Sequence, residues 1–167
     1  MIKKSMALIL TLLLLVIAGS VTGEEIAKEG SASGTTYFTY TPQVLAQGEA
    51  YLQMNYDARG VVTCDDETSI LHLATAHCVG AAKAIKGAFN ESGLCTFTRP
   101  DKDQIFGSYE ATGKLGEDAK GTTMFLGGTG KFEAMTGRQE YTRTSLQGPA
   151  KGVGASFVKF TYTWKIP

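Results

Sequence analysis

Residues 156–166 read Ser156-Phe157-Val158-Lys159-Phe160-Thr161-Tyr162-Thr163-Trp164-Lys165-Ile166. Large apolar side chains occupy every second position of this run, namely Val158, Phe160, Tyr162, Trp164 and Ile166. The positions between them hold Lys159, Thr161, Thr163 and Lys165. Successive side chains of a β-strand point to opposite faces of the sheet. The alternation therefore predicts a strand whose aromatic face is buried and whose other face is exposed to solvent.

Similar patterns recur upstream. Residues 49–59 alternate, with one face formed by Ala50, Leu52, Met54 and Tyr56, and residues 61–63 extend this strand past Gly60, where a bulge is expected. Other strands are expected at 35–41 (ending at Pro42), 69–78, 94–98, 104–112, 122–126 and 139–145. In the 69–78 strand, Leu71, Leu73 and His77 would share a face. Residues 79–89 stay open between strand and short helix, because their alanines favour a helix and their glycines oppose a long one.

These segments total about eight strands, so we predict an all-β fold and, within it, an eight-stranded antiparallel β-barrel. Such a barrel has no exposed sheet edges and encloses side chains or one small ligand. A β-sandwich is the alternative. The turn at residues 100–103 (Pro-Asp-Lys-Asp) separates two of the strands.

The N-terminus has the pattern of a secretory signal peptide over residues 1–23. Lys3 and Lys4 precede an apolar core at 7–17, and small residues follow at 18–23. The core is shorter than the roughly 20 residues of a membrane span, which is the alternative interpretation. Residues 24–34 are small and polar and predict a flexible arm, and residues 35–167 form the barrel domain. We therefore expect a periplasmic or secreted protein with no membrane attachment after cleavage.

Charge gives no sign of a nucleic-acid partner. The chain has 16 basic and 16 acidic residues, and removing residues 1–23 leaves 14 against 16, a formal charge of −2. That balance lacks the basic surplus that nucleic acid or anionic lipid requires.

A glycine-rich segment connects two of the predicted strands: Gly127-Gly128-Thr129-Gly130-Lys131-Phe132-Glu133-Ala134-Met135-Thr136-Gly137. Its spacing does not match a phosphate-binding loop, because Phe125 and Phe132 stand where that motif needs Gly and Ser or Thr. We predict a structural turn whose backbone dihedral angles are accessible mainly to glycine, at Gly127, Gly128, Gly130 and Gly137. Phe132 and Met135 would together fill one end of the barrel.

The residues suited to chemistry form no recognisable catalytic or metal-binding set. The two histidines, His72 and His77, are five apart and would point to opposite faces of a strand. The chain has no Gly-x-Ser-x-Gly motif. We expect no metal and no cofactor. His77 is expected to be a hydrogen-bonded interior side chain.

Three local patterns together resemble exported bacterial proteins of the allene oxide cyclase barrel-like group, whose fold is similar to that of plant dirigent proteins. They are the glycine segment, residues 93–106 (Gly-Leu-Cys-Thr-Phe-Thr-Arg-Pro-Asp-Lys-Asp-Gln-Ile-Phe) and residues 76–80 (Ala-His-Cys-Val-Gly). The resemblance covers residues 35–166. It implies an eight-stranded barrel with a central cavity and a Cys78–Cys95 disulfide with Cys64 free. A Cys64–Cys78 bond across a hairpin is the alternative.

The leading functional hypothesis is a barrel that binds a small apolar ligand or acts structurally. The residues expected at its cavity are Tyr56, His77, Phe160, Tyr162 and Trp164. The first alternative is an isomerase or cyclase that uses Glu110, Glu133, His77 or Tyr162 as acid or base. A buried carboxyl with a raised pKa in the cavity would favour this alternative. The second is a self-associating surface protein, which would make the chain a homo-oligomer.

Overall fold

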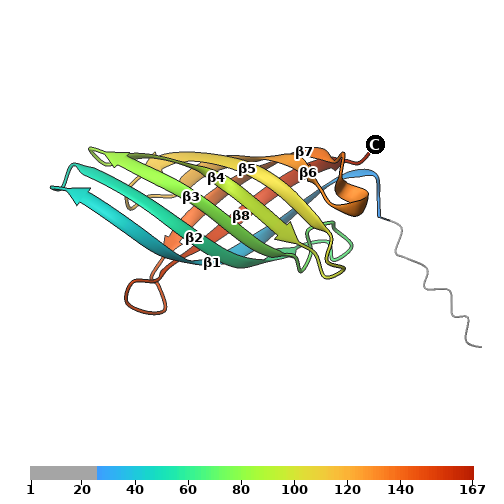
Figure 1. The fold of residues 1–167 in the computed structure, drawn as a ribbon, viewed down its shortest axis with the longest axis horizontal. Coiled ribbons are helices and arrows are strands. Elements are labelled where there is room, and N and C mark those ends of the chain that lie inside the picture. The colour runs from blue at the N-terminus through green and yellow to red at the C-terminus, as the bar shows by residue number, and fades with distance from the viewer. Residues whose placement is uncertain (1–25) are drawn as a thin grey trace, which may run out of the picture.

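The computed structural model describes residues 26–167, and the predicted signal peptide and residues 24 and 25 lie outside this part of the chain. The described chain forms a closed antiparallel barrel of eight strands (Figure 1). The strands are β1 (Glu29–Gln47), β2 (Tyr51–Cys64), β3 (Thr75–Ile85), β4 (Ala88–Thr98), β5 (Gln104–Lys114), β6 (Ala119–Gly128), β7 (Thr136–Leu146) and β8 (Gly154–Lys165). None of the helices among residues 26–167 has both the length and the apolar character that crossing a bilayer requires.

Each strand pairs with its neighbour along the chain, and β8 pairs with β1 to close the barrel. The closing ladder runs from Glu29 opposite Lys165 to Tyr40 opposite Gly154. The prediction of an all-β, eight-stranded antiparallel barrel is therefore confirmed, and the sandwich is excluded. The aromatic side chains of the final strand point inward as expected, with Phe160, Tyr162 and Trp164 all buried.

The N-terminal arm predicted at residues 24–34 is wrong from Glu29 onward, because β1 begins there and pairs with β8. Small residues allow this contact, since the ring of Trp164 lies where a side chain at Gly30 would stand. Strand β1 also continues through Pro42 to Gln47. Gly60 forms no bulge, and the register shift lies instead between Phe106 and Gly107.

The strand predicted at residues 69–78 is wrong in its first half. Residues 65–74 form a looped turn in which the backbone N–H of His72 donates to the Ser69 carbonyl at 3.0 Å. Leu73 has a φ of 56° and is exposed, whereas Leu71 is fully buried, so the two leucines share no face. The apolar residues of this run predict a strand, whereas the turn that forms depends on local backbone hydrogen bonds, which leave no periodic pattern in the sequence.

The segment at residues 79–89, left open between strand and helix, is a hairpin. Strand β3 ends at Ile85, and Lys86 and Gly87 both have positive φ (50° and 85°), as a tight two-residue hairpin turn requires. Ala82 and Ala84 face the interior, where small side chains fit the narrow barrel.

The glycine segment closes the barrel end that also holds the C-terminus (Figure 1). Gly127 and Gly130 have positive φ (104° and 55°), and Gly130 begins the 3₁₀ turn η1 (Gly130–Phe132). Phe132 and Met135 are 0% and 1% exposed and belong to the main apolar core. These two side chains therefore fill the end of the barrel, as the sequence predicts. Lys131 holds the turn from outside through a 2.8 Å ion pair with Asp101.

A disulfide joins Cys78 of β3 to Cys95 of β4, which lie directly opposite each other with Cα atoms 4.1 Å apart. The predicted pairing is confirmed, and Cys64 is free and buried.

Replacing both Cys78 and Cys95 with alanine is expected to lower the free energy of unfolding by about 3 kcal/mol, because the bond closes a loop of 17 residues in the unfolded chain. Urea unfolding of the oxidised wild type and the double variant measures this. Adding reductant should destabilise the wild type and leave the double variant unchanged.

Candidate functional site

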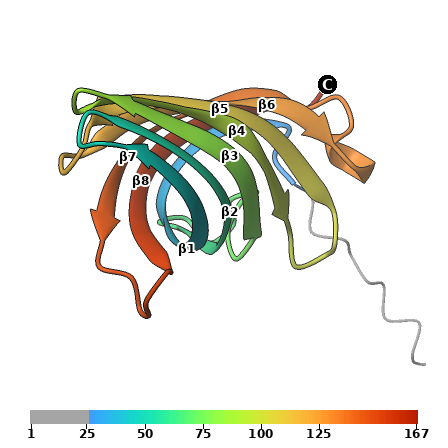
Figure 2. The same cartoon turned by 60° about the vertical axis from the view of Figure 1, so that its left-hand side comes forward.

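A cavity occupies the half of the barrel farther from the glycine segment. It has a volume of about 70 Å³. Apolar side chains make up much of its wall, including Phe38, Met54, Ala58, Phe97 and Val158. The strands curve around the barrel interior (Figure 2). Inward-facing positions of β2, β4, β5 and β7 supply the tyrosine and charged side chains Tyr56, Glu91, Tyr109 and Arg143, and Thr36, Thr123 and Ser156 add hydroxyl groups from β1, β6 and β8.

Glu91 is the central polar residue of the cavity. It lies on β4 in phase with Phe89 and Cys95, so its side chain points into the barrel and is only 3% exposed. Its Oε2 atom is 3.1 Å from Nη2 of Arg143, which comes from β7. Arg143 also lies over the ring of Phe89, and its buried Nε has no acceptor among the described residues. An ion pair thus bridges two strands that are not neighbours in the sheet.

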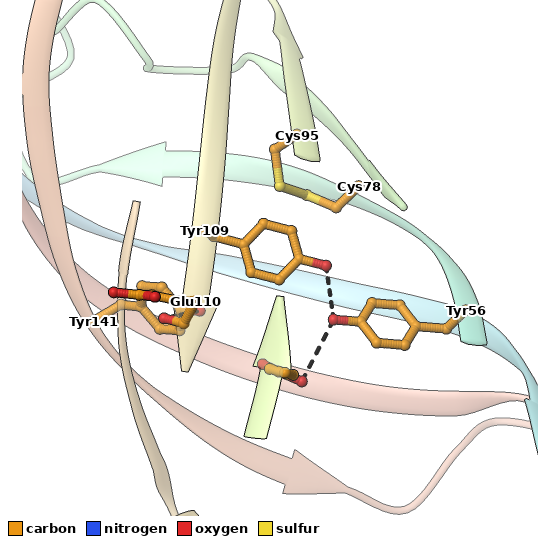
Figure 3. Close-up of a disulfide and its surroundings, with 7 residues drawn as sticks. Tyr56, Cys78, Cys95, Tyr109, Glu110 and Tyr141 are labelled. Atoms are coloured by element: carbon orange, nitrogen blue, oxygen red, sulfur yellow. Dashed lines mark hydrogen bonds between the residues drawn. A yellow bond between two sulfur atoms is a disulfide. The ribbon is translucent and has the colours of Figure 1, made fainter. Parts of the chain in front are cut away.

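Two tyrosines extend this ion pair into a hydrogen-bonded chain beside the disulfide (Figure 3). The Tyr56 hydroxyl donates to Oε2 of Glu91 at 3.4 Å and lies 2.7 Å from the Tyr109 hydroxyl. Tyr56 has one hydroxyl hydrogen and donates it to the Glu91 carboxylate, so Tyr109 must be the donor in the bond between the two tyrosines. The series of hydrogen bonds therefore runs from Tyr109 through Tyr56 to Glu91.

Burial dominates the electrostatics of this cluster. It raises the pKa of Glu91, an effect that Arg143 and the Tyr56 hydrogen bond offset only in part. Burial likewise raises the pKa of Tyr109 to about 12 and that of Tyr56 far above its ordinary value. The tyrosines accordingly remain proton donors at physiological pH, and Glu91 holds a proton more tightly than an ordinary glutamic acid.

Glycines give the inward tyrosines their space. Gly80 and Gly93 lie opposite each other on β3 and β4, and a Cβ atom at either position would collide with the Tyr109 hydroxyl. Gly121 on β6 has the same relation to Tyr141. Each ring thus lies flat across a neighbouring strand, which is possible only where that strand has no side chain.

Gly93→Ala is expected to push the Tyr109 ring away and break its hydrogen bond to Tyr56, and also to press the new Cβ against the Val79 carbonyl oxygen. The expected cost is roughly 1–3 kcal/mol in unfolding free energy, of which only the Tyr109 part can be relieved by a smaller side chain at 109. Urea unfolding measures the loss. Ser92→Ala is the matched control, since Ser92 is exposed on the outer face. Combining Gly93→Ala with Tyr109→Leu should recover part of the stability, and no recovery would count against this account.

The structure brings only one of the five predicted cavity residues, Tyr56, to the cavity. Phe160, Tyr162 and Trp164 fill the other half of the barrel, where neighbouring ring centroids are 5.9 and 5.3 Å apart. His77 lies on the outer face, 42% exposed and 3.0 Å from the Asp57 carboxylate. The prediction of an interior His77 is wrong because Cys78 takes the inward position, and adjacent strand residues face opposite ways.

The predicted acid and base residues also lie elsewhere. Glu110 and Glu133 are exposed, and Figure 3 shows Glu110 on the strand that carries Tyr109. The Tyr162 hydroxyl is hydrogen-bonded to Ser69. Sequence reasoning missed Glu91, Tyr109 and Arg143. The signal for Glu91 was present, because it interrupts an apolar stripe that ends in Cys95 and Phe97.

Comparisons with known proteins bear on the fold alone. No family model matches the chain, and no curated protein matches it. Among solved structures the chain is similar to a pterocarpan synthase dirigent protein, with a TM-score of 0.52 and 13% sequence identity. The match covers 89% of this chain and 96% of that one. The barrel is therefore dirigent-like, as the sequence resemblance implies.

Proposed function

We propose that the barrel binds a small, largely apolar molecule whose polar end lies against Glu91, Arg143 and Tyr56. The buried ion pair between Glu91 and Arg143, facing a cavity whose wall is mostly apolar, carries this proposal. Apolar residues of similar volume usually stabilise a core at least as well as a buried ion pair does. Ligand binding would explain why the cavity contains a buried ion pair that the stability of the core does not require.

The geometry limits what this ligand is. Aromatic and aliphatic walls favour apolar groups, while a few fixed polar groups orient one end of a ligand. The free Nε–H of Arg143 favours an acceptor oxygen, such as a carbonyl or a phenol. The cavity volume of about 70 Å³ is below the range typical of whole-ligand pockets. We therefore expect one end group to enter the cavity while the rest lies toward the barrel mouth.

Mass spectrometry of small molecules extracted from natively purified protein tests this proposal. A molecule enriched with the wild type should be lost from Ala58→Phe, which fills the cavity, and depleted in Glu91→Gln, which removes the ion pair without changing volume. Val61→Phe is the matched control, because it places the same ring on the outer face of β2. Equal recovery from all four proteins, or none from any, would contradict a ligand site.

An isomerase or cyclase is the second candidate, and the raised pKa of Glu91 favours it. A carboxyl with a raised pKa can act as a general acid while it holds its proton, with Tyr56 and Tyr109 as a hydrogen-bonded relay. The dirigent protein of similar fold is named a pterocarpan synthase, which makes a catalytic role worth testing in this chain. The wild type should convert the extracted molecule to an isomer of equal mass, and Glu91→Gln, supplied with the molecule at a concentration high enough to offset its weaker binding, should not convert it.

We also propose that the barrel works in the periplasm or outside the cell. The Cys78–Cys95 disulfide supports this, because such bonds persist in oxidising compartments. N-terminal sequencing of exported protein should give a start near residue 21 or 24. Protein that retains Met1 and stays in a reducing compartment would contradict it.

A further inference from the structure

One strand edge of the barrel has no partner. Strand β1 pairs with β2 as far as Gln47, but it pairs with β8 only as far as Tyr40, opposite Gly154. Residues 41–47 therefore have a neighbouring strand on one side only. In Figure 1 this part of β1 belongs to the hairpin that extends furthest at the end opposite η1, and the loop at 147–153 bends away from it in both views.

The hydrogen bonds at the start of β1 show which residues face each side. The Lys28 carbonyl accepts from the N–H of Ile166, next to β8, at 2.6 Å, and the Ser33 carbonyl accepts from Asp65, next to β2, at 3.0 Å. A residue in an antiparallel strand directs its N–H and C=O to the same neighbour. Since neither β1 register contains a shift, even-numbered residues of β1 bond toward β8 and odd-numbered ones toward β2.

Past Tyr40, the even-numbered residues Pro42, Val44 and Ala46 thus direct their backbone groups to the open side. Proline has no N–H, so the edge presents three carbonyls and two N–H donors, and none of these has a backbone partner among residues 26–167. An edge of this kind is a template for another strand unless charged side chains or a central proline block it, and here the one proline, Pro42, lies at the end of the edge. Residues 41–47 contain no charged side chain.

We propose that two copies of this chain pair antiparallel along residues 42–46 of β1, about a two-fold axis at Val44. In this register the two Val44 residues exchange both of their hydrogen bonds. Each Ala46 N–H donates to the Pro42 carbonyl of the second copy. Because Pro42 has no N–H, the Ala46 carbonyl opposite it accepts no hydrogen bond from the second copy. This carbonyl lies at the end of the pairing, where water can donate to it instead.

The side chains and charges of this segment favour a second copy over a dissimilar partner. Val44 and Leu45 are 54% and 63% exposed, and they lie on opposite faces of β1. In the two-fold register, Val44 lies opposite Val44 of the second copy and Leu45 lies opposite Gln43 of the second copy. Both apolar side chains therefore become less exposed to solvent. An uncharged segment neither repels its copy nor offers a charge that would select a different chain.

Sedimentation equilibrium over a wide concentration range tests this pairing. The wild type should form a concentration-dependent dimer. Val44→Pro should weaken it roughly tenfold or more, because the symmetric pair loses both Val44 N–H groups. Val44 bonds toward the open side, so this proline removes no bond inside the barrel, and an unchanged near-UV circular dichroism spectrum checks the fold. Val79→Lys, on the exposed outer face, should leave the dimer intact.

A covalent test keeps the proposal independent of proline. Val44→Cys should form a disulfide-linked dimer under mild oxidation, since opposed residues of a hydrogen-bonded pair have Cα atoms about 5.5 Å apart. Gln47→Cys, near the hairpin tip, should not. The proposal fails if the wild type is monomeric at all concentrations, or if Val79→Lys rather than Val44→Pro abolishes the dimer, since the barrel face would then be the interface.

Discussion

Trp164→Ala is expected to lower the free energy of unfolding by about 3–5 kcal/mol, the range found when a packed core aromatic is truncated. Trp164 is 8% exposed, its ring centroid lies 5.3 Å from that of Tyr162, and its Nε1–H donates to the Ala27 carbonyl at 3.0 Å. The ring also covers Gly30. The substitution therefore removes apolar contacts and the hydrogen bond that holds the start of the described chain against β8.

Urea unfolding with wild type, Trp164→Phe and Trp164→Ala measures this effect. Trp164→Phe should lose less, because it keeps an apolar ring and loses only the N–H donor and part of the volume. Trp164 is the only tryptophan, so the wild-type fluorescence should be blue-shifted and protected from aqueous quenchers. Because Trp164 lies outside the cavity, Trp164→Ala should leave binding of a cavity ligand unchanged in protein that is still folded.

The sequence predicted the strands of the barrel correctly where one face of a strand is buried and the other is exposed to solvent. Residues 156–166 alternate because β8 has the core on one side and solvent on the other. Alternation failed at 69–74, where a looped turn buries Leu71 and exposes Leu73 without regard to period. It also failed at 79–89, because small inward alanines carry almost no contrast in hydrophobicity.

The candidate site was harder to predict than the fold. Tyr56 was found because it continues a clear apolar face. Glu91 was missed because a buried carboxylate makes sense only with Arg143, which lies 52 positions further along the chain. That pairing depends on how the barrel closes and is not visible in any local window. Likewise, the glycines opposite Tyr109 reveal their role only when β3, β4 and β5 are side by side.

Glu91→Leu is expected to cost about 3–5 kcal/mol, because it leaves the largely buried Arg143 without its carboxylate. The loss should be measured by urea unfolding at a pH above the folded-state pKa of Glu91, so that the wild type contains the ionised pair. The double variant Glu91→Leu/Arg143→Met replaces the whole ion pair with apolar side chains and should recover most of the loss, or exceed wild-type stability. Glu110→Leu is the control, since that carboxylate is exposed and should matter little.

The pH dependence of the same proteins tests the pKa shift of Glu91. Burial raises its folded-state pKa above the ordinary value of 4.5, so the folded protein binds this proton more tightly than the unfolded chain does. The resulting stabilisation is fully present below pH 4.5 and is lost as pH rises through the folded-state pKa. The stability of the wild type relative to the double variant should therefore fall with rising pH above 4.5 and then level off. A difference that rises over this range would mean that Arg143 outweighs burial, which would remove the main support for Glu91 as a general acid.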